Sequence, residues 1–283
     1  MKLEDYHTHS ELCHHAVGTI EDYIKKALDL NLNTIGICAH FPYEFLNNIE
    51  RIPYEEYAMN IDEIEDYLTT GEILREKFKN QINIRVGFEV DFFENQEPAL
   101  NIHLNKIKDR LDYILGSIHI LNFNDGRGAW GFDDSRFKED YQYYGPDNVY
   151  VEYFKTQQKM LNSTKFDLDI IGHFDLPKKF NNFPNDKEVI ENKVFKTLEL
   201  IKKRDLTIEI NSGGLRKDVK QQYPSKEIIQ SMYEHDIPVL LGSDAHAPNE
   251  IAWEFKNLIK MLKKIGYNQL VHYYKRKRRF IEI

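Results

Sequence analysis

Short apolar segments rich in β-branched residues alternate along the chain with longer segments of helical periodicity. The short segments have the length and composition of buried strands and cover residues 3–9, 34–40, 82–91, 112–121, 168–175, 206–212 and 237–246. Such alternation is typical of βα units around a parallel sheet. The pattern therefore predicts an α/β fold, either a distorted, TIM-like (β/α)7 barrel or a doubly wound open sheet.

The segments between these strands carry helix signals. In residues 19–32 apolar side chains recur on one helical face, and Thr19 followed by Asp22 resembles a capping box with aspartate in place of glutamate or glutamine. The connection 120–167 is long, and its sequence NFNDGRGAWGFDDSRF indicates a loop or lid. No low-complexity linker divides the chain, so we expect residues 1–283 to form a single domain that contains this connection.

Composition and charge narrow the class of protein. Hydrophobic residues make up 41% of the chain and aromatic residues 13%, which is enough for a sizeable core. The formal net charge of -8 argues against general binding of nucleic acid. Two cysteines, Cys13 and Cys38, cannot form a disulfide scaffold, which favours a reducing environment. Without a signal-peptide pattern or an 18-residue apolar run, we expect a soluble, cytoplasmic protein with no membrane partner.

The apolar segments repeatedly end in polar residues that can bind metal ions, namely His7, His9, His40, Glu89, His119, His173, Asp244 and His246. His15 lies in the loop just after the first strand. In parallel α/β barrels the carboxyl ends of the strands meet on one face, where active sites lie. His7 and His9 share a strand face about 7 Å apart. Asp244 and His246 have the same spacing, and a barrel would bring the first and last strands together.

Imidazole nitrogens together with carboxylate oxygens suit Zn, Fe or Mn better than Ca or Mg. We therefore expect two to three divalent metal ions at the carboxyl ends of the strands. The other histidines are expected to be ordinary packed or surface residues, namely His14, His103, His235 and His272. Cys13 and Cys38 are expected to pack in the core. The basic segment that begins at Lys275 is expected to be a solvated chain end rather than a nucleic-acid contact.

Nine short motifs occur along the chain in this order: HTHSELCHHAVGT, AHFPY, GFEVDFF, ILGSIHIL, WGFD, DIIGHFDLPKKF, IEINSGGLRK, YPS and LGSDAH. Together they resemble the polymerase and histidinol phosphatase (PHP) family, and specifically its histidinol-phosphatase branch. The resemblance covers nearly the whole chain. It implies a distorted (β/α)7 barrel with a trinuclear metal centre, which agrees with the number of predicted strands.

The resemblance also implies three groups of metal ligands. The first ion would bind His7, His9, Glu89 and Asp244, the second His15, His40 and His246, and the third His119 and His173, with Glu89 shared between the first and third. One position departs from the family pattern. The family has an acidic residue just before the second-strand histidine, whereas this chain has Ala39. A carboxylate that orients the His40 imidazole would then be missing. Its absence would affect how fully the second metal site is occupied or which metal it binds, but not the existence of the site.

The resemblance implies hydrolysis of L-histidinol phosphate to L-histidinol and phosphate, a step of histidine biosynthesis that acts on a small phosphorylated substrate. The positive charge of three divalent ions would exceed the negative charge of the Glu89 and Asp244 carboxylates, so the pocket would be cationic. A water that bridges the ions would ionise near neutral pH, and we expect the resulting hydroxide to attack phosphorus in line. Two alternatives stay open: another PHP phosphoesterase, such as a nuclease, nucleotide phosphatase or phosphotyrosine phosphatase, and a metal-binding protein without catalysis.

Two further residues are candidates for catalysis. Arg216 is the candidate phosphate contact, because a guanidinium group binds phosphate through two parallel hydrogen bonds. Asp175, two residues after His173 on the same strand face, is expected to orient a ligand or to protonate the leaving group. Other side chains that could reach the substrate are Arg127, Arg136, Glu209 and Asn211. For the last two, a structural hydrogen-bond network is an equally good interpretation.

Overall fold

The chain, described here by a computed structural model for residues 3–283, contains one sheet of seven strands in the order β1-β2-β3-β4-β7-β8-β9. All neighbouring strands in this sheet are parallel. Their bounds are β1 Glu4–Asp5, β2 Thr34–His40, β3 Asn83–Asp91, β4 Tyr113–Ser117, β7 Ile170–Ile171, β8 Thr207–Asn211 and β9 Val239–Gly242. Each strand lies within one of the segments predicted from the sequence.

Hydrogen bonds between the first and last strands close the sheet. The backbone N–H of Tyr6 donates to the carbonyl of Leu241 at 3.0 Å, and that of His9 donates to Ala245 at 2.9 Å. Thr8 and Ala245 form a parallel bridge just beyond the two strands. The barrel prediction is therefore confirmed, and the open doubly wound sheet is not the architecture.

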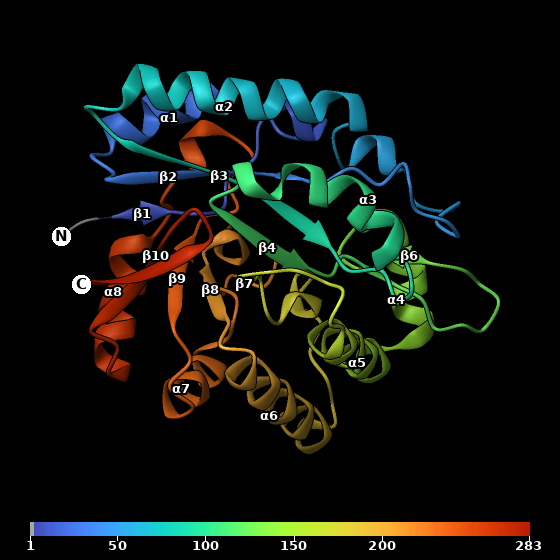
Figure 1. Cartoon of the computed structure of the whole chain (residues 1–283). Coiled ribbons are helices and arrows are strands. Elements are labelled where there is room, and N and C mark those ends of the chain that lie inside the picture. The colour runs from blue at the N-terminus through green and yellow to red at the C-terminus, as the bar shows by residue number, and fades with distance from the viewer. Residues whose placement is uncertain (1–2) are drawn as a thin grey trace.

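Helices surround the barrel (Figure 1). Their bounds are α1 Ile20–Asp29, α2 Ile64–Phe78, α3 Glu97–Ile107, α4 Lys138–Tyr144, α5 Pro146–Asn162, α6 Lys187–Lys203, α7 Lys226–Glu234 and α8 Phe255–Ile265. Short 3-10 turns are η1 Glu11–Cys13, η2 Tyr54–Glu56, η3 Ile61–Glu63, η4 Lys108–Arg110, η5 Ser135–Phe137, η6 Leu176–Lys178, η7 Gly213–Arg216 and η8 Pro248–Glu250. The predicted capping box of Thr19 and Asp22 begins α1. Across residues 3–283, no helix has the length and apolar character needed to span a bilayer.

The strands separate an outer hydrophobic layer from an inner one. On β2, Ile37 and Ala39 belong to the large cluster between strands and helices. The inner cluster fills the barrel and consists of Tyr6, Cys38, Tyr113, Leu115, Ile170, Leu240, Val271 and Tyr273. Because successive strand residues face opposite sides, His40 points to the same side as Cys38, at the carboxyl end of the barrel interior.

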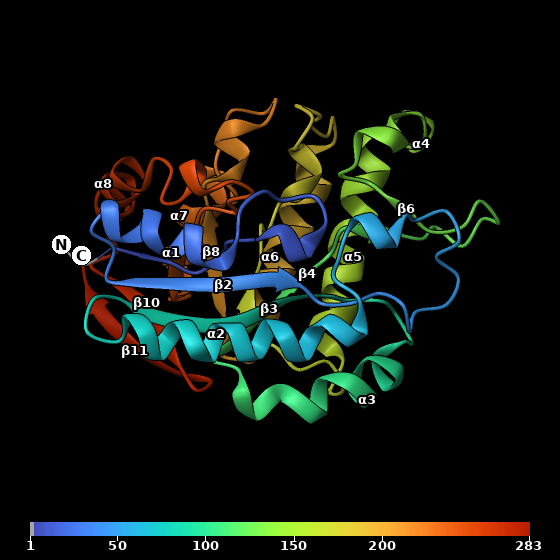
Figure 2. The ribbon, with the colours of Figure 1, turned by 90° about the horizontal axis from the view of Figure 1, so that it is seen from above.

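The C-terminal residues form an antiparallel hairpin of β10 Gln269–Tyr274 and β11 Lys277–Glu282. The basic segment is solvated only in part. Lys275, Lys277 and Arg279 are exposed, as predicted, but Arg276 forms ion pairs with Asp167 and Asp169, and Arg278 pairs with Asp205. The hairpin also supplies two side chains of the inner cluster. Figure 2 shows it at the end of the barrel opposite to α4 and β6.

The long connection 120–167 is more ordered than a loop. It contains an antiparallel pair, β5 Ile120–Leu121 and β6 Trp130–Gly131, followed by α4 and α5. Ion pairs join it to the segment after β2: Arg51 binds Asp140 at 2.7 Å, and Arg136 binds Glu56 at 2.6 Å. The two segments are thereby held together beside the carboxyl ends of the strands.

Candidate metal centre

The nine predicted ligands meet at the carboxyl end of the barrel. Two of them lie in strands: His40 is the last residue of β2, and Glu89 lies two residues before the end of β3. The others follow β1, β4, β7 and β9. Their side chains form one continuous set of contacts among His7, His9, His15, His40, Glu89, His119, His173, Asp244 and His246. The closure of β1 onto β9 places the N-terminal pair beside the C-terminal one.

The first predicted group surrounds a small buried volume. His7 Nε2 lies 3.0 Å from Glu89 Oε2 and 3.8 Å from Asp244 Oδ1. His9 Nε2 lies 3.5 Å and 3.3 Å from the same two oxygens. Ligand atoms of His7, His9 and Glu89 lie within 4.8 Å of one another, which allows one cation to bind these three residues. Asp244 approaches both imidazoles, and its place as the fourth ligand stays a prediction.

The second predicted group, His15, His40 and His246, is not separate from the first, because His9 also lies close to it. The Nε2 atoms of His15 and His246 lie 3.0 Å apart, and the ring of His246 stacks on that of His9 with centroids 4.2 Å apart. Ligand atoms of His9, His40 and His246 all lie within 4.8 Å of one another. His9 is therefore close to both the first and the second group, and the three-residue set implied by the family resemblance stays a prediction.

Glu89 joins the third group to the first. Its Oε1 atom lies 2.8 Å from His173 Nε2 and 3.6 Å from His119 Nε2, whereas its Oε2 atom faces His7. The two histidines of the third group approach within 3.1 Å at their Nε2 atoms. One buried carboxylate with its two oxygens directed at different groups of imidazoles has the geometry of a bridging ligand.

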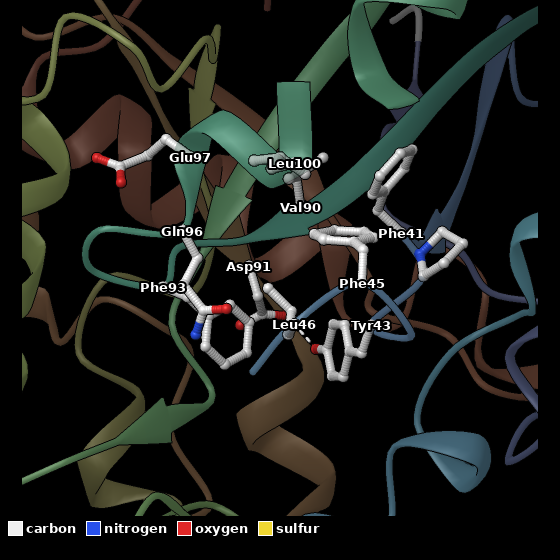
Figure 3. Close-up of a pocket in the computed structure, with 11 residues that line it drawn as sticks. Phe41, Tyr43, Phe45, Leu46, Val90, Asp91, Phe93, Gln96, Glu97 and Leu100 are labelled. Carbon is white, nitrogen blue, oxygen red and sulfur yellow. Dashed lines mark hydrogen bonds between the residues drawn. The ribbon is translucent and has the colours of Figure 1, made fainter. Parts of the chain in front are cut away.

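Two carboxylates behind the imidazoles fix ring orientation. Glu209 Oε1 accepts from His7 Nδ1 at 2.8 Å, and Asp91 Oδ1 accepts from His119 Nδ1 at 2.9 Å. Tyr43 donates its hydroxyl hydrogen to Asp91 (Figure 3). Carboxylate partners of this kind select the tautomer that leaves Nε2 free for a metal and increase the basicity of the ring.

Asp91 was not among the predicted site residues, although a signal was present. Asp91 stands two residues after Glu89 at the end of β3, and so shares its strand face. For Glu209 both interpretations were left open. Its other oxygen accepts from the side-chain amide of Asn211 at 3.0 Å, which matches the structural network.

The protonation states suit metal binding at most of the ligands. Burial lowers the pKa of His9 and of His246 to about 3, and it also lowers the pKa of His15. Burial alone would raise the pKa of Glu89, but the surrounding imidazoles hold it well below its ordinary value. Neutral imidazoles and an ionised carboxylate are the forms that bind a cation.

Two histidines differ from this pattern. Burial would lower the pKa of His7, but Glu209 and Glu89 raise it well above its ordinary value. In His119 burial is likewise outweighed by Asp91 and Glu89, and the pKa is raised to about 10. These shifts favour the protonated form of both rings when no cation is near, and binding of a cation would displace that proton.

Unpartnered buried nitrogen atoms show that these residues fit a metal centre. His9 Nε2 and His40 Nδ1 are buried and have no hydrogen-bond partner within residues 3–283. Polar atoms left in this state cost about 1–3 kcal/mol each, so a site that keeps them needs an external partner. The donor set of imidazoles and carboxylates suits Zn, Fe or Mn, and several overlapping groups of three could each hold an ion.

Ala39 lies on the outer face of β2. Its side chain is buried in the cluster between strands and helices, and its backbone N–H lies 3.3 Å from the hydroxyl of Tyr67 on α2. The imidazole of His40 points to the opposite face, into the barrel. Because of this alternation, a carboxylate at position 39 would not face the His40 ring in this fold.

Arg216 lies next to the centre but is bound to the backbone. Its guanidinium donates to the carbonyls of Ser243 and Asp244 at 2.9 Å each, and its Nε atom lies 3.3 Å from Glu250. One guanidinium nitrogen is buried without a partner in the described chain. These contacts position the strand end that carries Asp244, and the role of Arg216 as a phosphate contact stays a prediction.

Asp175 is buried away from the ligand imidazoles. It forms an ion pair with Lys178 at 2.7 Å and accepts from the backbone N–H of Ser225 at 2.9 Å. Across residues 3–283, no hydrogen bond joins its side chain to a ligand histidine. Its contacts favour a structural role, and its predicted part in orienting a ligand or protonating the leaving group stays untested.

A cleft of about 690 Å³ opens over the centre and is lined by seven of the nine ligands. Its outer wall contains three cationic and three acidic side chains, which are Lys179, Lys217, Arg136, Glu56, Asp133 and Asp134. Lys179 Nζ lies 2.9 Å from Asp133 Oδ2. Arg136 therefore lines the cleft as predicted for a residue of the long connection, whereas Arg127 lies over the ring of Tyr143.

The remaining four histidines do not join the ligand set. His14 lines the outer cleft, where its Nδ1 bonds to the carbonyl of Glu55. The other three contact neighbouring protein groups: His103 stacks on Phe45, His235 bonds to Ser231, and His272 bonds to Glu4. Lys179 and Asp133 are among the cleft residues that were not predicted, because nothing in the linear sequence indicates their proximity.

Gly242 provides the space that the centre needs, and we expect Gly242→Ala to disrupt it. A methyl group at this position would overlap Glu209 Oε1 and lie 2.8 Å from His7 Cβ. The variant is expected to lower the free energy of unfolding by about 1–3 kcal/mol and to reduce metal content by displacing the His7–Glu209 pair. Chemical denaturation and elemental analysis measure both effects. Wild-type values for both would show that the backbone can adjust.

Comparison with known proteins agrees with this geometry. Residues 5–213 match the model of the PHP domain family. A Deinococcus radiodurans protein named "Probable histidinol-phosphatase" is 30% identical over 264 residues, which cover 93% of this chain and 94% of that protein. The HisK structure from Listeria monocytogenes has a TM-score of 0.82 at 27% identity and covers 90% of this chain and 99% of its own.

A second solved structure shares the fold at lower identity. Histidinol phosphate phosphatase from Lactococcus lactis, complexed with zinc, L-histidinol and phosphate, has a TM-score of 0.79 at 18% identity and covers 98% of this chain and 99% of its own. The barrel, the convergence of imidazoles and carboxylates at its carboxyl end, and the match over residues 5–213 lead to one assignment. The chain belongs to the PHP domain family.

Proposed function

We propose that the protein is a metal-dependent phosphomonoesterase that hydrolyses L-histidinol phosphate to L-histidinol and phosphate in histidine biosynthesis. The observation that carries this proposal is the cluster of imidazoles and carboxylates at the base of a cleft of about 690 Å³. A cleft of this size accommodates a small phosphorylated molecule. The relatives named for histidinol-phosphatase activity support the choice of substrate. We place the reaction in the cytoplasm.

The residues that would hold two to three divalent ions are His7, His9, His15, His40, Glu89, His119, His173, Asp244 and His246. When bound there, such ions supply an activated water and neutralise charge on the phosphoryl oxygens. Glu209 and Asp91 hold the rings of His7 and His119 with Nε2 directed inward. Preorganised groups of this kind lower the reorganisation that accompanies the reaction.

Lys179 is placed to attract the phosphate group. Burial alone would lower its pKa, but Asp133 outweighs burial and raises it, so the ammonium group stays charged at neutral pH. The lysine lines the same cleft as Glu89 and His173, and its partner Asp133 limits its motion. An ammonium held beside the metal ligands attracts a phosphate dianion before and during reaction.

Acidic side chains at the cleft mouth fit the other end of the substrate. Histidinol phosphate carries an amino group and an imidazole in addition to its phosphate, and both can be cationic. Glu56 and Asp134 line the outer cleft, where they share Arg136 as a partner. Opposite charges at the base and the mouth would orient a substrate that is anionic at one end and cationic at the other.

A comparison of substrates tests the proposal. Protein loaded with Zn or Mn is assayed with histidinol phosphate, a nucleoside monophosphate, a phosphotyrosine peptide and single-stranded DNA. We expect the highest kcat/KM for histidinol phosphate. Comparable or higher efficiency on another member of the panel would assign a different PHP phosphoesterase activity. Loaded protein with no phosphatase activity on any of them would indicate a metal-binding protein.

Replacing Lys179 is expected to weaken catalysis without loss of metal. The variant Lys179→Met removes the cation and leaves Asp133 to repel phosphate, so kcat/KM for histidinol phosphate should fall by about 10- to 100-fold. Lys178→Met is the matched control, because that lysine is buried against Asp175 and does not line the cleft. It should lower thermal stability while KM stays near the wild-type value. An unchanged kcat/KM in Lys179→Met would show that Lys179 contributes neither to substrate binding nor to catalysis.

A further inference from the structure

The Nδ1 atoms of the ligand histidines have different hydrogen-bond partners. His7 and His119 use carboxylates, as described above. His9 uses a thiol instead, because its Nδ1 lies 3.3 Å from Cys13 Sγ, and both side chains are fully buried. A sulfur atom is a weak hydrogen-bond acceptor and carries no charge as a thiol, so this contact differs chemically from the other two.

The backbone of the same cysteine holds a second ligand. The carbonyl of Cys13 accepts from His15 Nδ1 at 2.6 Å. The chain reverses between them, since His14 adopts a left-handed conformation with φ 61° at the end of the 3-10 turn Glu11–Cys13. The turn itself is closed by the hydrogen bond from Cys13 N to Ser10 O at 2.9 Å. One buried residue thus contacts two ligand imidazoles through different atoms.

We propose that Cys13 is a positioning residue of the metal centre, which holds His9 through its thiol sulfur and His15 through its carbonyl oxygen. The proposal rests on the metal centre described under the proposed function. It assigns His9 the tautomer with hydrogen on Nδ1, so that Nε2 faces Glu89 and Asp244 with its lone pair. Nε2 is otherwise unpartnered within residues 3–283, which agrees with that tautomer.

A thiol in this position has a consequence that a carboxylate would not have. Glu209 places a negative charge behind His7, which strengthens that ring as a ligand. Cys13 fixes the ring of His9 without adding charge to a region that already contains the carboxylates of Glu89 and Asp244. The ring of His9 is thus oriented, while its strength as a metal ligand stays close to that of a free imidazole. Removing the acceptor should therefore weaken metal binding by allowing the ring to rotate or change tautomer.

Matched cysteine variants test the proposal. Cys38 is also buried, but its side chain belongs to the apolar cluster inside the barrel. We expect Cys13→Ala to lower Zn affinity, measured by competition with a chelator, by about 10- to 100-fold. It should also change the visible absorption spectrum of the protein loaded with Co. Cys38→Ala should lower thermal stability and leave Zn affinity within about threefold of wild type. Cys13→Ser, which retains a hydrogen-bond acceptor, should restore most of the affinity.

Equal Zn affinities and Co spectra in the two alanine variants would overturn the proposal, and so would a serine variant no better than alanine. A further test uses the wild-type protein and therefore does not depend on whether the variants fold. NMR of the histidine nitrogens in Zn-loaded wild type should find the hydrogen of His9 on Nδ1, and a hydrogen on Nε2 would overturn the proposal. These readouts do not use turnover, so they are independent of whether histidinol phosphate is the substrate.

Discussion

Replacing Glu89 with glutamine is expected to lower kcat for histidinol phosphate by about a thousandfold or more and to remove at least one metal ion. Glutamine keeps the shape of the side chain but has no charge, and it exchanges one oxygen for a nitrogen that donates hydrogen bonds. In the wild type, Oε2 lies 3.0 Å from His7 Nε2 and Oε1 lies 2.8 Å from His173 Nε2. No orientation of the amide can serve both groups. Loss of metal-assisted activation of water and of charge stabilisation together explains an effect of this size.

Steady-state kinetics and elemental analysis of the purified variant measure the two effects. Glu97→Gln is a matched control, because Glu97 is also a buried carboxylate but lies at the start of α3, where it accepts a hydrogen bond from Ser163. It should keep both metal content and kcat. Full metal occupancy in Glu89→Gln would contradict the bridging role, even if activity were lost.

The ligand positions could be predicted because strand ends are local features. A short apolar segment followed by histidine or aspartate is visible in the linear sequence, and a parallel barrel brings such ends to one face. The i, i+2 spacing of His7 and His9 likewise follows from strand geometry. The structure joins all nine side chains in one continuous set of contacts at that face. Which ion each of them binds depends on distances of a few tenths of an ångström, which no sequence pattern contains.

Contacts between distant segments could not be predicted in the same way. Lys179 faces Asp133 because the long connection folds back over the barrel, and the two residues are far apart in sequence. The C-terminal hairpin was missed for a related reason. Its arginines look solvated in a basic segment, but their partners Asp167, Asp169 and Asp205 come from loops that precede β7 and β8. Charge pairing across such separations requires the complete fold.

Asp175 shows where a strand-face argument is insufficient. Asp175 follows His173 by two residues, which predicts a shared face only while the chain stays extended. The chain turns there, because Asp175 has φ −123° and ψ 42° and the 3-10 turn Leu176–Lys178 begins immediately after it. Its carboxylate therefore bonds to the turn and to Ser225. A polar residue just past a strand end can thus belong to the following turn rather than to the site.

Removing the metal ions is expected to abolish activity and to destabilise the fold. Without ions, the buried carboxylate of Glu89 and the half-buried one of Asp244 stay among imidazoles, and several buried nitrogens keep no partner within residues 3–283. Ions that bind only the folded chain, at about a thousand times their dissociation constant, stabilise it by about 4 kcal/mol. For a chain of this length we expect a chelator to lower the melting temperature by about 10 °C.

Thermal unfolding with and without a chelator, followed by addition of Zn or Mn, measures this effect. Both melting temperature and kcat should recover when an ion is restored, because the ligand side chains are held by the barrel strands rather than by the ions alone. Glu89→Gln gives the internal comparison, since a variant that has already lost its shared ion should respond less to the chelator. Wild-type protein that stays active after elemental analysis shows complete metal removal would contradict the catalytic role of the centre. The imidazole cluster would then be explained as a structural network, and Glu89→Gln should retain its activity.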